Sequence, residues 1–274
     1  MIKSFQPGHL DIFSIKYNPS QNLSFNRIRT HIFMISRELR AKVFSQFLTV
    51  TPENKPPNGV EIIFMRIALM IFQDELQKNL QKNSDIQEIF QDAFLRADKQ
   101  LNENAGKHSG CTAVTAFLRS EPETIKFENE NEVNGKDPSA CNANVGDARA
   151  VLNRDGRAVR LSYDHKGSDA QEAKRIVEAG GFVMNNRVNG VLAVTRSLGD
   201  CSMKEFVIGK PYTTKITLTE KDSFLILACD GLWDVCNDQE AVDLIKDIMD
   251  PQEASTKLIR HALQNFSTDN LSVM

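Results

Sequence analysis

Hydrophobic positions recur with helical spacing in four parts of the chain. The clearest pattern predicts an amphipathic helix from about residue 86, because apolar side chains follow one another every three or four positions. Ser84, followed three residues later by Gln87, is typical of a capping box at its start. Weaker patterns predict helices over 169–179, 238–249 and 251–265, the first ending at Gly180-Gly181, where glycine can take the left-handed conformation. The apolar positions of the clearest helix are Ile86, Ile89, Phe90, Ala93, Phe94, Ala97 and Leu101.

Short β-type runs fill much of the remaining chain. The Asp155-Gly156 pair predicts a hairpin turn into residues 157–161. The polar, acidic stretch 120–139 predicts an exposed loop. Strands joined by hairpins, without regular β-α-β alternation, favour an α+β layered fold. The other predicted strands are 112–118, 140–145, 148–153, 223–229 and 271–274, of which the last stops at the terminus.

Composition narrows the class of protein. A chain of 274 residues, 41% of them hydrophobic, can bury a substantial core, and we expect one compact domain. The formal net charge of −3, without a basic run, argues against nucleic acid or an anionic membrane as partner. The most apolar segment, 62–72, is too short to span a bilayer, and five cysteines without C-x-x-C spacing favour reduced thiols. We therefore expect a cytoplasmic or nuclear protein.

Three aspartates follow or separate predicted strands. They are Asp147, Asp230 and Asp269. Each one alone is compatible with a simple turn role, because Asp-Gly and Asp-Asn are common turn pairs. Carboxylates that converge without cysteine or histidine partners suit hard cations such as Mg²⁺ or Mn²⁺. Together they indicate a hydrolytic metal site.

Six short motifs follow one another over about 130 residues. They are Ala143-Asn-Val-Gly-Asp-Ala-Arg149, Leu161-Ser-Tyr-Asp-His-Lys166, Glu178-Ala-Gly-Gly181, Arg187-Val-Asn-Gly-Val-Leu-Ala-Val-Thr-Arg-Ser-Leu-Gly-Asp200, Leu225-Ile-Leu-Ala-Cys-Asp-Gly-Leu-Trp-Asp-Val235 and Thr268-Asp-Asn-Leu-Ser-Val273. In order and spacing they resemble the motifs of the metal-dependent protein serine/threonine phosphatases of type 2C, the PPM family, and most closely its small fungal members. Ser109-Gly-Cys-Thr-Ala113 is similar to an earlier family strand, so the resemblance extends from about residue 70 to the end.

The resemblance implies a four-layer α/β/β/α sandwich of two antiparallel sheets flanked by helices. It also implies two Mg²⁺ or Mn²⁺ ions, with a third held more weakly, and hydrolysis of phosphoserine or phosphothreonine by a metal-activated water. By position, Asp230 and Asp269 match ligands of the metal pair and Asp147 a ligand of the third metal, while Asp200 resembles a further acidic group of that outer site. No catalytic residue beyond the metal site and no organic cofactor is implied.

The resemblance also implies a phosphoprotein substrate, and the fungal relatives suggest a stress-pathway kinase as partner; we expect a monomer. Other polar residues have structural interpretations as well. His165 is expected to anchor a turn rather than transfer a proton, and Trp233 to line the core or the cleft. Arg196 and Lys166 could contact phosphate or form salt bridges.

Two family motifs are missing. They are an Arg before Met-Glu-Asp, which grips phosphate, and Asp-Gly-His-Gly/Ala, whose Asp bridges both metals. Residues 46–64, back-translated and read one base earlier, can encode Ala-Val-Phe-Asp-Gly-His-Ala-Gly-Lys and the helix that follows it. The same shift over 27–35 can give Asp-Thr-His-Thr-Tyr-Ile-Tyr-Asp-Phe. We infer a frame disruption that recovers between Met65 and Leu76.

The chain therefore divides into two parts. Residues 1–66 are an unassigned, frame-shifted segment that we expect to pack poorly, and 67–274 form a phosphatase domain lacking its first motifs and last strand. The polypeptide as written should be an impaired enzyme. Two alternatives remain: a pseudophosphatase that binds kinases or phosphoproteins without turnover, and a hydrolase of small phosphate esters. Retention of three unpaired carboxylates argues against the former.

Overall fold

A computed structural model describes residues 15–17, 31–35, 41–50, 85–104, 110–119 and 138–274. In the first three of these ranges only the backbone is described. Ser84 and most of the predicted loop 120–139 lie outside the described residues. Among the helices of the described part, none has the length and apolar character needed to cross a membrane.

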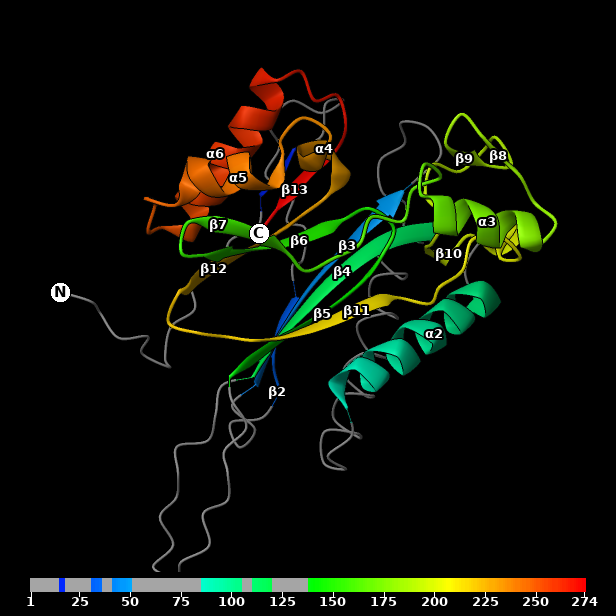
Figure 1. The fold of residues 1–274 in the computed structure, drawn as a ribbon, viewed down its shortest axis with the longest axis horizontal. Helices are drawn as coiled ribbons and strands as arrows, with labels where there is room; N and C mark the ends of the chain where they lie inside the picture. The colour runs from blue at the N-terminus through cyan, green and yellow to red at the C-terminus, as the bar shows by residue number, and fades with distance from the viewer. Residues whose placement is uncertain (1–14, 18–30, 36–40, 51–84, 105–109, 120–137) are drawn as a thin grey trace, which may run out of the picture.

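Two antiparallel sheets pack face to face, and helices cover both outer surfaces (Figure 1). The first sheet has the order β1 (Ile15–Tyr17), β13 (Leu271–Val273), β12 (Asp222–Ala228), β6 (Arg149–Arg154) and β7 (Arg157–Arg160). The second has the order β11 (Tyr212–Thr217), β5 (Ser139–Val145), β4 (Gly110–Arg119), β3 (Ala41–Val50) and β2 (His31–Ile35), with β10 (Leu198–Gly199) also paired to β4.

The helices form the outer layers. Helix α2 (Ile86–Asn104) lies on the second sheet against β5 and β11, while α5 (Asp238–Ile245) and α6 (Pro251–Gln264) cover the first. The short helix α4 (Asp230–Trp233) follows β12 directly. Helix α3 (Ala170–Glu178), the hairpin β8 (Val183–Met184) and β9 (Arg187–Val188), and the 3₁₀ turn η2 (Cys201–Met203) complete the described elements. The fold class is thus the predicted α/β/β/α sandwich.

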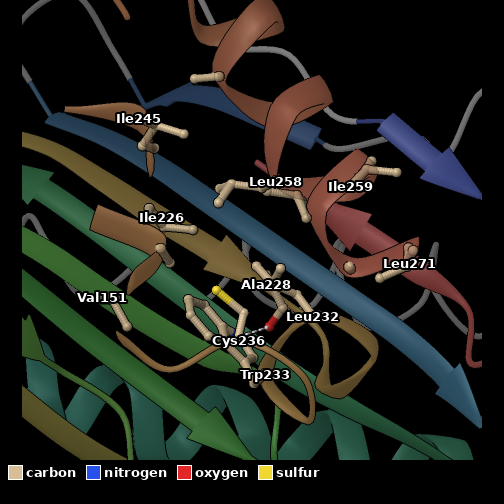
Figure 2. Packing of buried hydrophobic residues seen from close by; sticks show 14 of the residues in the cluster. Val151, Ile226, Ala228, Leu232, Trp233, Cys236, Ile245, Leu258, Ile259 and Leu271 are labelled. Carbon is tan, nitrogen blue, oxygen red and sulfur yellow. Dashed lines mark hydrogen bonds between the residues drawn. The ribbon is translucent and has the colours of Figure 1, made fainter. Parts of the chain in front are cut away.

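Successive side chains of a strand point to opposite faces of its sheet, so the buried residues fall into two groups, one on each face. Val114 and Ala116 of β4 belong to an apolar cluster with Ala150 and Leu152 of β6, between the two sheets. A second cluster lies between the first sheet and helices α4, α5 and α6 (Figure 2). In it, the indole of Trp233 donates a hydrogen bond of 2.9 Å to the Ala228 carbonyl, which confirms the core position expected for this tryptophan.

Most predicted elements are confirmed, with differences at their ends. The helix predicted over 238–249 ends at Ile245, and Asn237 closes its start through a capping box with Glu240. Strands β1, β2 and β3 lie in the unassigned segment and were not predicted. Strand β11, the two-residue strands, η2 and α4 were not predicted either, because each is too short or too polar to show a periodic signal. Residues 1–66 contribute the backbone of β1, β2 and β3. The five cysteines all lie within the described residues and form no disulfide.

Candidate metal centre

Asp147 lies where the chain crosses from one sheet to the other. Strand β5 ends at Val145 in the second sheet and β6 begins at Arg149 in the first, so the residues between them form a tight connection. Gly146 has a φ of +82°, and a Cβ there would come 2.3 Å from Cγ2 of Thr112. Only glycine fits both the conformation and the space. The connection therefore holds the buried Asp147 carboxylate at one end of the sandwich.

The carbonyl of Gly146 is the anchor of this connection. It accepts a hydrogen bond of 3.0 Å from the backbone N–H of His165, and it also lies 3.0 Å from Nδ1 of the same residue. Nδ2 of Asn144 approaches it at 3.3 Å. Burial, with the nearby Arg196 charge, lowers the pKa of His165 to about 4, so the ring is neutral and Nδ1 carries the donated proton. His165 thus holds the polypeptide around Asp147, in line with its predicted anchoring role.

Asp230 and Asp269 are brought together by two neighbouring strands. Asp230 begins α4 directly after β12, and Asp269 precedes β13, which is paired with β12. The two loops are in close contact, because a Cβ on Gly231 would lie 2.4 Å from the carbonyl oxygen of Asn270. Ser267 Oγ also donates a hydrogen bond of 2.7 Å to the Gly231 carbonyl. Each aspartate accepts the N–H of the residue that follows it.

The electrostatics indicate that these carboxylates lie near one another. Burial and the charges of Asp147, Asp269 and Asp234 together raise the pKa of Asp230 to about 7. The pKa of Asp147 is also raised, first by burial and then by Asp164 and Asp234, against the opposing charge of Lys166. The charge of Asp230 therefore interacts with those of Asp147 and Asp269, and the role of the three as metal ligands stays a prediction.

Asp234 is a fourth carboxylate that the sequence analysis left out of the site. It lies four residues after Asp230, at the end of a helical turn. That four-residue spacing could have identified it from the sequence. Lys166 Nζ lies 3.1 Å from Asp234 Oδ1 and 3.5 Å from Asp147 Oδ2. Of the two interpretations offered for Lys166, the structure shows the salt bridge.

Arg196 is likewise held by an ion pair. Its guanidinium lies 2.6 Å from Oε1 of Glu172, which is buried and also accepts hydrogen bonds from Thr195 Oγ1 and from Arg175. A second nitrogen of Arg196 donates to the Lys210 carbonyl at 3.0 Å. These contacts join α3 to the loop before β10.

Asp200 belongs to a different group of polar residues. Its carboxylate accepts a short hydrogen bond from Ser197 Oγ, and a Cβ on Gly110 would collide with it. Burial raises the pKa of Asp200, and the charge of Asp98 raises it further, against the opposing effects of Ser197 and Lys204. The carboxylate of Asp98 in turn accepts a hydrogen bond of 2.8 Å from Nζ of Lys204. Asp200 thus lies beside the start of β4.

The chemistry of the donor set fits a hard divalent cation. The groups that meet at this site are carboxylate oxygens, the ligands that Mg²⁺ and Mn²⁺ prefer. Their mutual repulsion, which contributes to the raised pKa of Asp230, would be relieved by a bound cation. The Asp that bridges the two metals in the type 2C pattern has no counterpart among the described side chains.

Comparisons with known proteins agree with this arrangement. The family model described as "Protein phosphatase 2C" matches residues 69–271. The chain is 48% identical over 190 residues to "Protein phosphatase 2C homolog 1" of Saccharomyces cerevisiae, an alignment covering 69% of this chain and 68% of the yeast protein. It is 49% identical over 164 residues to the protein of the same name in Schizosaccharomyces pombe, covering 60% of this chain and 44% of that one.

Solved structures agree at the level of the fold. A phosphatase from Toxoplasma gondii superposes with a TM-score of 0.65 at 24% identity, covering 85% of this chain and 83% of its own. The two packed sheets and the match to these relatives together define a protein phosphatase. The chain belongs to the protein phosphatase 2C family, and this membership supports the function of a metal-dependent protein serine/threonine phosphatase.

Proposed function

We propose that the site hydrolyses phosphoserine and phosphothreonine in proteins with the help of two Mg²⁺ or Mn²⁺ ions and a weaker third. The observation that carries the proposal is the environment of Asp230, which is partly buried and repelled by Asp147, Asp269 and Asp234. Lys166 is the nearby cation that opposes this charge at Asp147. Such an excess of carboxylates is costly unless cations offset it.

The residues have separate roles in this proposal. Asp230 and Asp269 would hold the metal pair, and Asp147 would hold the outer ion. Asp200, which the resemblance implies for that outer site, lies in the separate polar group with Ser197 and Asp98. Bound metal would lower the pKa of a water and neutralise charge on the phosphoryl oxygens. His165 and Gly146 fix the direction of the Asp147 carboxylate, and Lys166 balances it when no metal is bound. In-line hydrolysis then needs no phosphorylated side chain.

The bridging ligand is proposed to come from the restored reading frame of residues 27–64. In that frame the Asp of Asp-Gly-His takes the place of Thr49 in β3. The backbone of residue 49 pairs with Cys111 of β4, and Val145 pairs with Ala113 of the same strand. Position 49 therefore lies at the end of the sheet where Asp147 lies. The family match from residue 69 also begins where we infer that the frame recovers.

Phosphate release from a phosphothreonine peptide tests the proposal. Three proteins are compared with and without Mn²⁺: the chain as written, a version with the frame restored over 27–64, and the restored version carrying Asp230→Asn. We expect Mn²⁺-dependent turnover from the restored chain and none from its Asp230→Asn variant. Equal turnover by the chain as written would refute the frame hypothesis, and turnover by the Asp230→Asn variant would refute the assigned site.

Sequencing the transcript across codons 20–80 in several isolates tests the frame separately. An uninterrupted frame in every isolate would count against a sequencing or intron error. The pseudophosphatase alternative predicts that even the restored chain binds a phosphopeptide without releasing phosphate. The small-ester alternative predicts faster turnover of a free phosphate ester than of the peptide. A stress-pathway kinase as partner is proposed from the fungal relatives and would be tested by co-purification with the restored chain.

A further inference from the structure

Three side chains with metal-binding atoms meet at a place distinct from the carboxylate site. They are Cys236, Glu240 and His261, and their ligand atoms all lie within 4.8 Å of one another. Cys236 and Glu240 flank the start of α5, and His261 lies on the C-terminal half of α6. The group is therefore built where two helices that cover the first sheet contact each other.

The three residues are held in place by the fold. Cys236 is buried in the second apolar cluster, beside Trp233 (Figure 2). Glu240 is fixed by the capping box, in which its Oε2 lies 3.4 Å from the N–H of Asn237. Its other oxygen, Oε1, is thereby left for His261, whose Nε2 lies 3.1 Å away. The ligand set is thus positioned by helix capping and core packing before any ion arrives.

We propose that Cys236, Glu240 and His261 form a binding site for a borderline-soft divalent cation, with Zn²⁺ as the natural occupant. A thiolate, an imidazole and a carboxylate form a three-residue set that suits Zn²⁺ in tetrahedral geometry. Mg²⁺ and Mn²⁺ prefer oxygen ligands and would remain at the aspartates. The inference does not depend on the proposed phosphatase activity, because no residue is shared between the two sites.

The site is open to solvent on the side of Glu240. An open cavity of about 500 Å³ reaches Glu240 and is also lined by Asn237, Gln239, Asp243, Leu244 and Lys257. Water or an exogenous ligand can therefore complete the tetrahedron from that side. The bound ion would join α5 to α6 across the outer layer of the first sheet, whose strand β12 leads into Asp230.

Binding must displace existing contacts. The Cys236 thiol has hydrogen bonds with Glu240 and, at 3.6 Å, with the Asn237 carbonyl, and Asn265 Nδ2 lies 3.2 Å from His261 Nε2. The thiol is protonated without metal, since burial and the charges of Glu240 and Asp238 outweigh Arg149 and raise its pKa to about 12. When the metal–sulfur bond forms, the S–H bond breaks and the proton leaves to solvent.

Cobalt titration of the full chain provides a direct test. The chain is reduced and freed of metal with a chelator, and Co²⁺ is added while the thiolate-to-cobalt charge-transfer absorption is followed. We expect the absorption to saturate at one equivalent and to disappear in Cys236→Ser. Cys229→Ser is the matched control, because Cys229 is a buried thiol beside Asp230 and its loss should leave the signal unchanged. His261→Gln should weaken binding at least tenfold.

Thermal unfolding with Zn²⁺ supplies a second measurement that does not need the cysteine to be replaced. Zn²⁺ should raise the midpoint of the original chain and of Asp230→Asn by the same amount, and should not raise that of His261→Gln. Absence of the charge-transfer absorption in the original chain, or its persistence in Cys236→Ser, would overturn the proposal. A Zn²⁺ shift lost in Asp230→Asn but kept in His261→Gln would also overturn it.

Discussion

The guanidinium of Arg149 lies over the ring of Trp233, 5.0 Å from its centroid. Arg149 follows Asp147 by two residues and Trp233 follows Asp230 by three, so this contact joins the two segments that supply the central carboxylates. The same guanidinium pairs with Asp164 at 2.6 Å and with Asp238 at 2.5 Å. Because its side chain is only 9% exposed, solvent screens these interactions weakly.

Arg149→Ala should therefore lower stability and activity together. Removing one partner from a buried ion-pair network leaves charges uncompensated, and we expect a loss of about 3 kcal/mol in the free energy of unfolding. Turnover by the frame-restored chain should fall roughly tenfold or more, since Asp147 and Asp230 lose a shared support. Urea unfolding and steady-state phosphopeptide hydrolysis measure the two effects.

Arg154→Ala is the matched control for this variant. Arg154 pairs with the buried Asp222 at 2.7 Å, at the opposite end of β6 from Asp147. Its removal should lower stability without changing turnover per folded molecule. An equal loss of turnover in both variants would mean that Arg149 acts only through global stability.

Asp230→Asn should stabilise the metal-free chain while weakening its response to Mn²⁺. The folded-state pKa of Asp230 is raised from 3.8 to about 7, so the folded protein binds this proton more tightly than the unfolded chain. The metal-free chain therefore loses stability as the pH rises from about 4 to about 7. The amide abolishes that loss, and we expect a gain on the order of 2 kcal/mol at pH 8.

Thermal unfolding in a chelator at pH 5 and pH 8 measures this difference. The gain should be largest at pH 8 and smaller at pH 5. Addition of Mn²⁺ should raise the midpoint of the original chain more than that of Asp230→Asn. A variant less stable than the original chain at pH 8 without metal would contradict the assigned repulsion.

Lys166→Met should tighten the binding of the outer metal ion. The ammonium lies within 3.5 Å of both Asp147 and Asp234 and must give way when a cation reaches those oxygens. Because Lys166 is about one third exposed, we expect about a fivefold gain in Mn²⁺ affinity, on the order of 1 kcal/mol. Calorimetric titration measures this directly.

Lys246→Met is the control, since Lys246 pairs with the half-exposed Asp243 on the surface at 3.1 Å. Its Mn²⁺ affinity should equal that of the original chain. If Lys166→Met instead leaves metal affinity unchanged and raises the KM for phosphopeptide, Lys166 contacts the substrate phosphate rather than competing with the metal.

Glu172→Gln should destabilise the protein at neutral pH. Burial by itself would raise the pKa of Glu172, but hydrogen bonds from Arg196, Arg175 and Thr195 outweigh it and lower the pKa from 4.5 to about 2. The ionised carboxylate therefore contributes stability above pH 4.5, which is lost as the pH falls toward 2. The shift corresponds to about 3 kcal/mol.

Urea unfolding at pH 7 and pH 3 tests this sign. The deficit of Glu172→Gln relative to the original chain should be largest at pH 7 and smaller at pH 3. Glu178→Gln, which removes an exposed ion pair with Lys174 on the same helix, should change stability by less than about 0.5 kcal/mol. A deficit of Glu172→Gln that is independent of pH would show that the ionised form is not preferentially stabilised.

Several elements could be predicted because their signal is local. The apolar side chains of 86–101 lie on one buried face of a helix, and the continuous apolar run 223–229 forms a strand. In both segments the pattern of apolar residues reflects the packing directly. Strand β11 could not be found in this way. Its residues are exposed or partly exposed, and it is a strand because β5 offers it hydrogen bonds from Tyr212 to Thr217.

The sequence by itself determined the motif order, the α+β class and three candidate carboxylates, because each depends on residue type and near neighbours. Only the tertiary structure decided which charges meet. Asp234, Lys166 and Arg149 enter the site through contacts between segments far apart in the chain. Cys236, Glu240 and His261 converge because α5 packs on α6. Coulomb interactions depend on distance in space, which the pattern of residues along the chain does not contain.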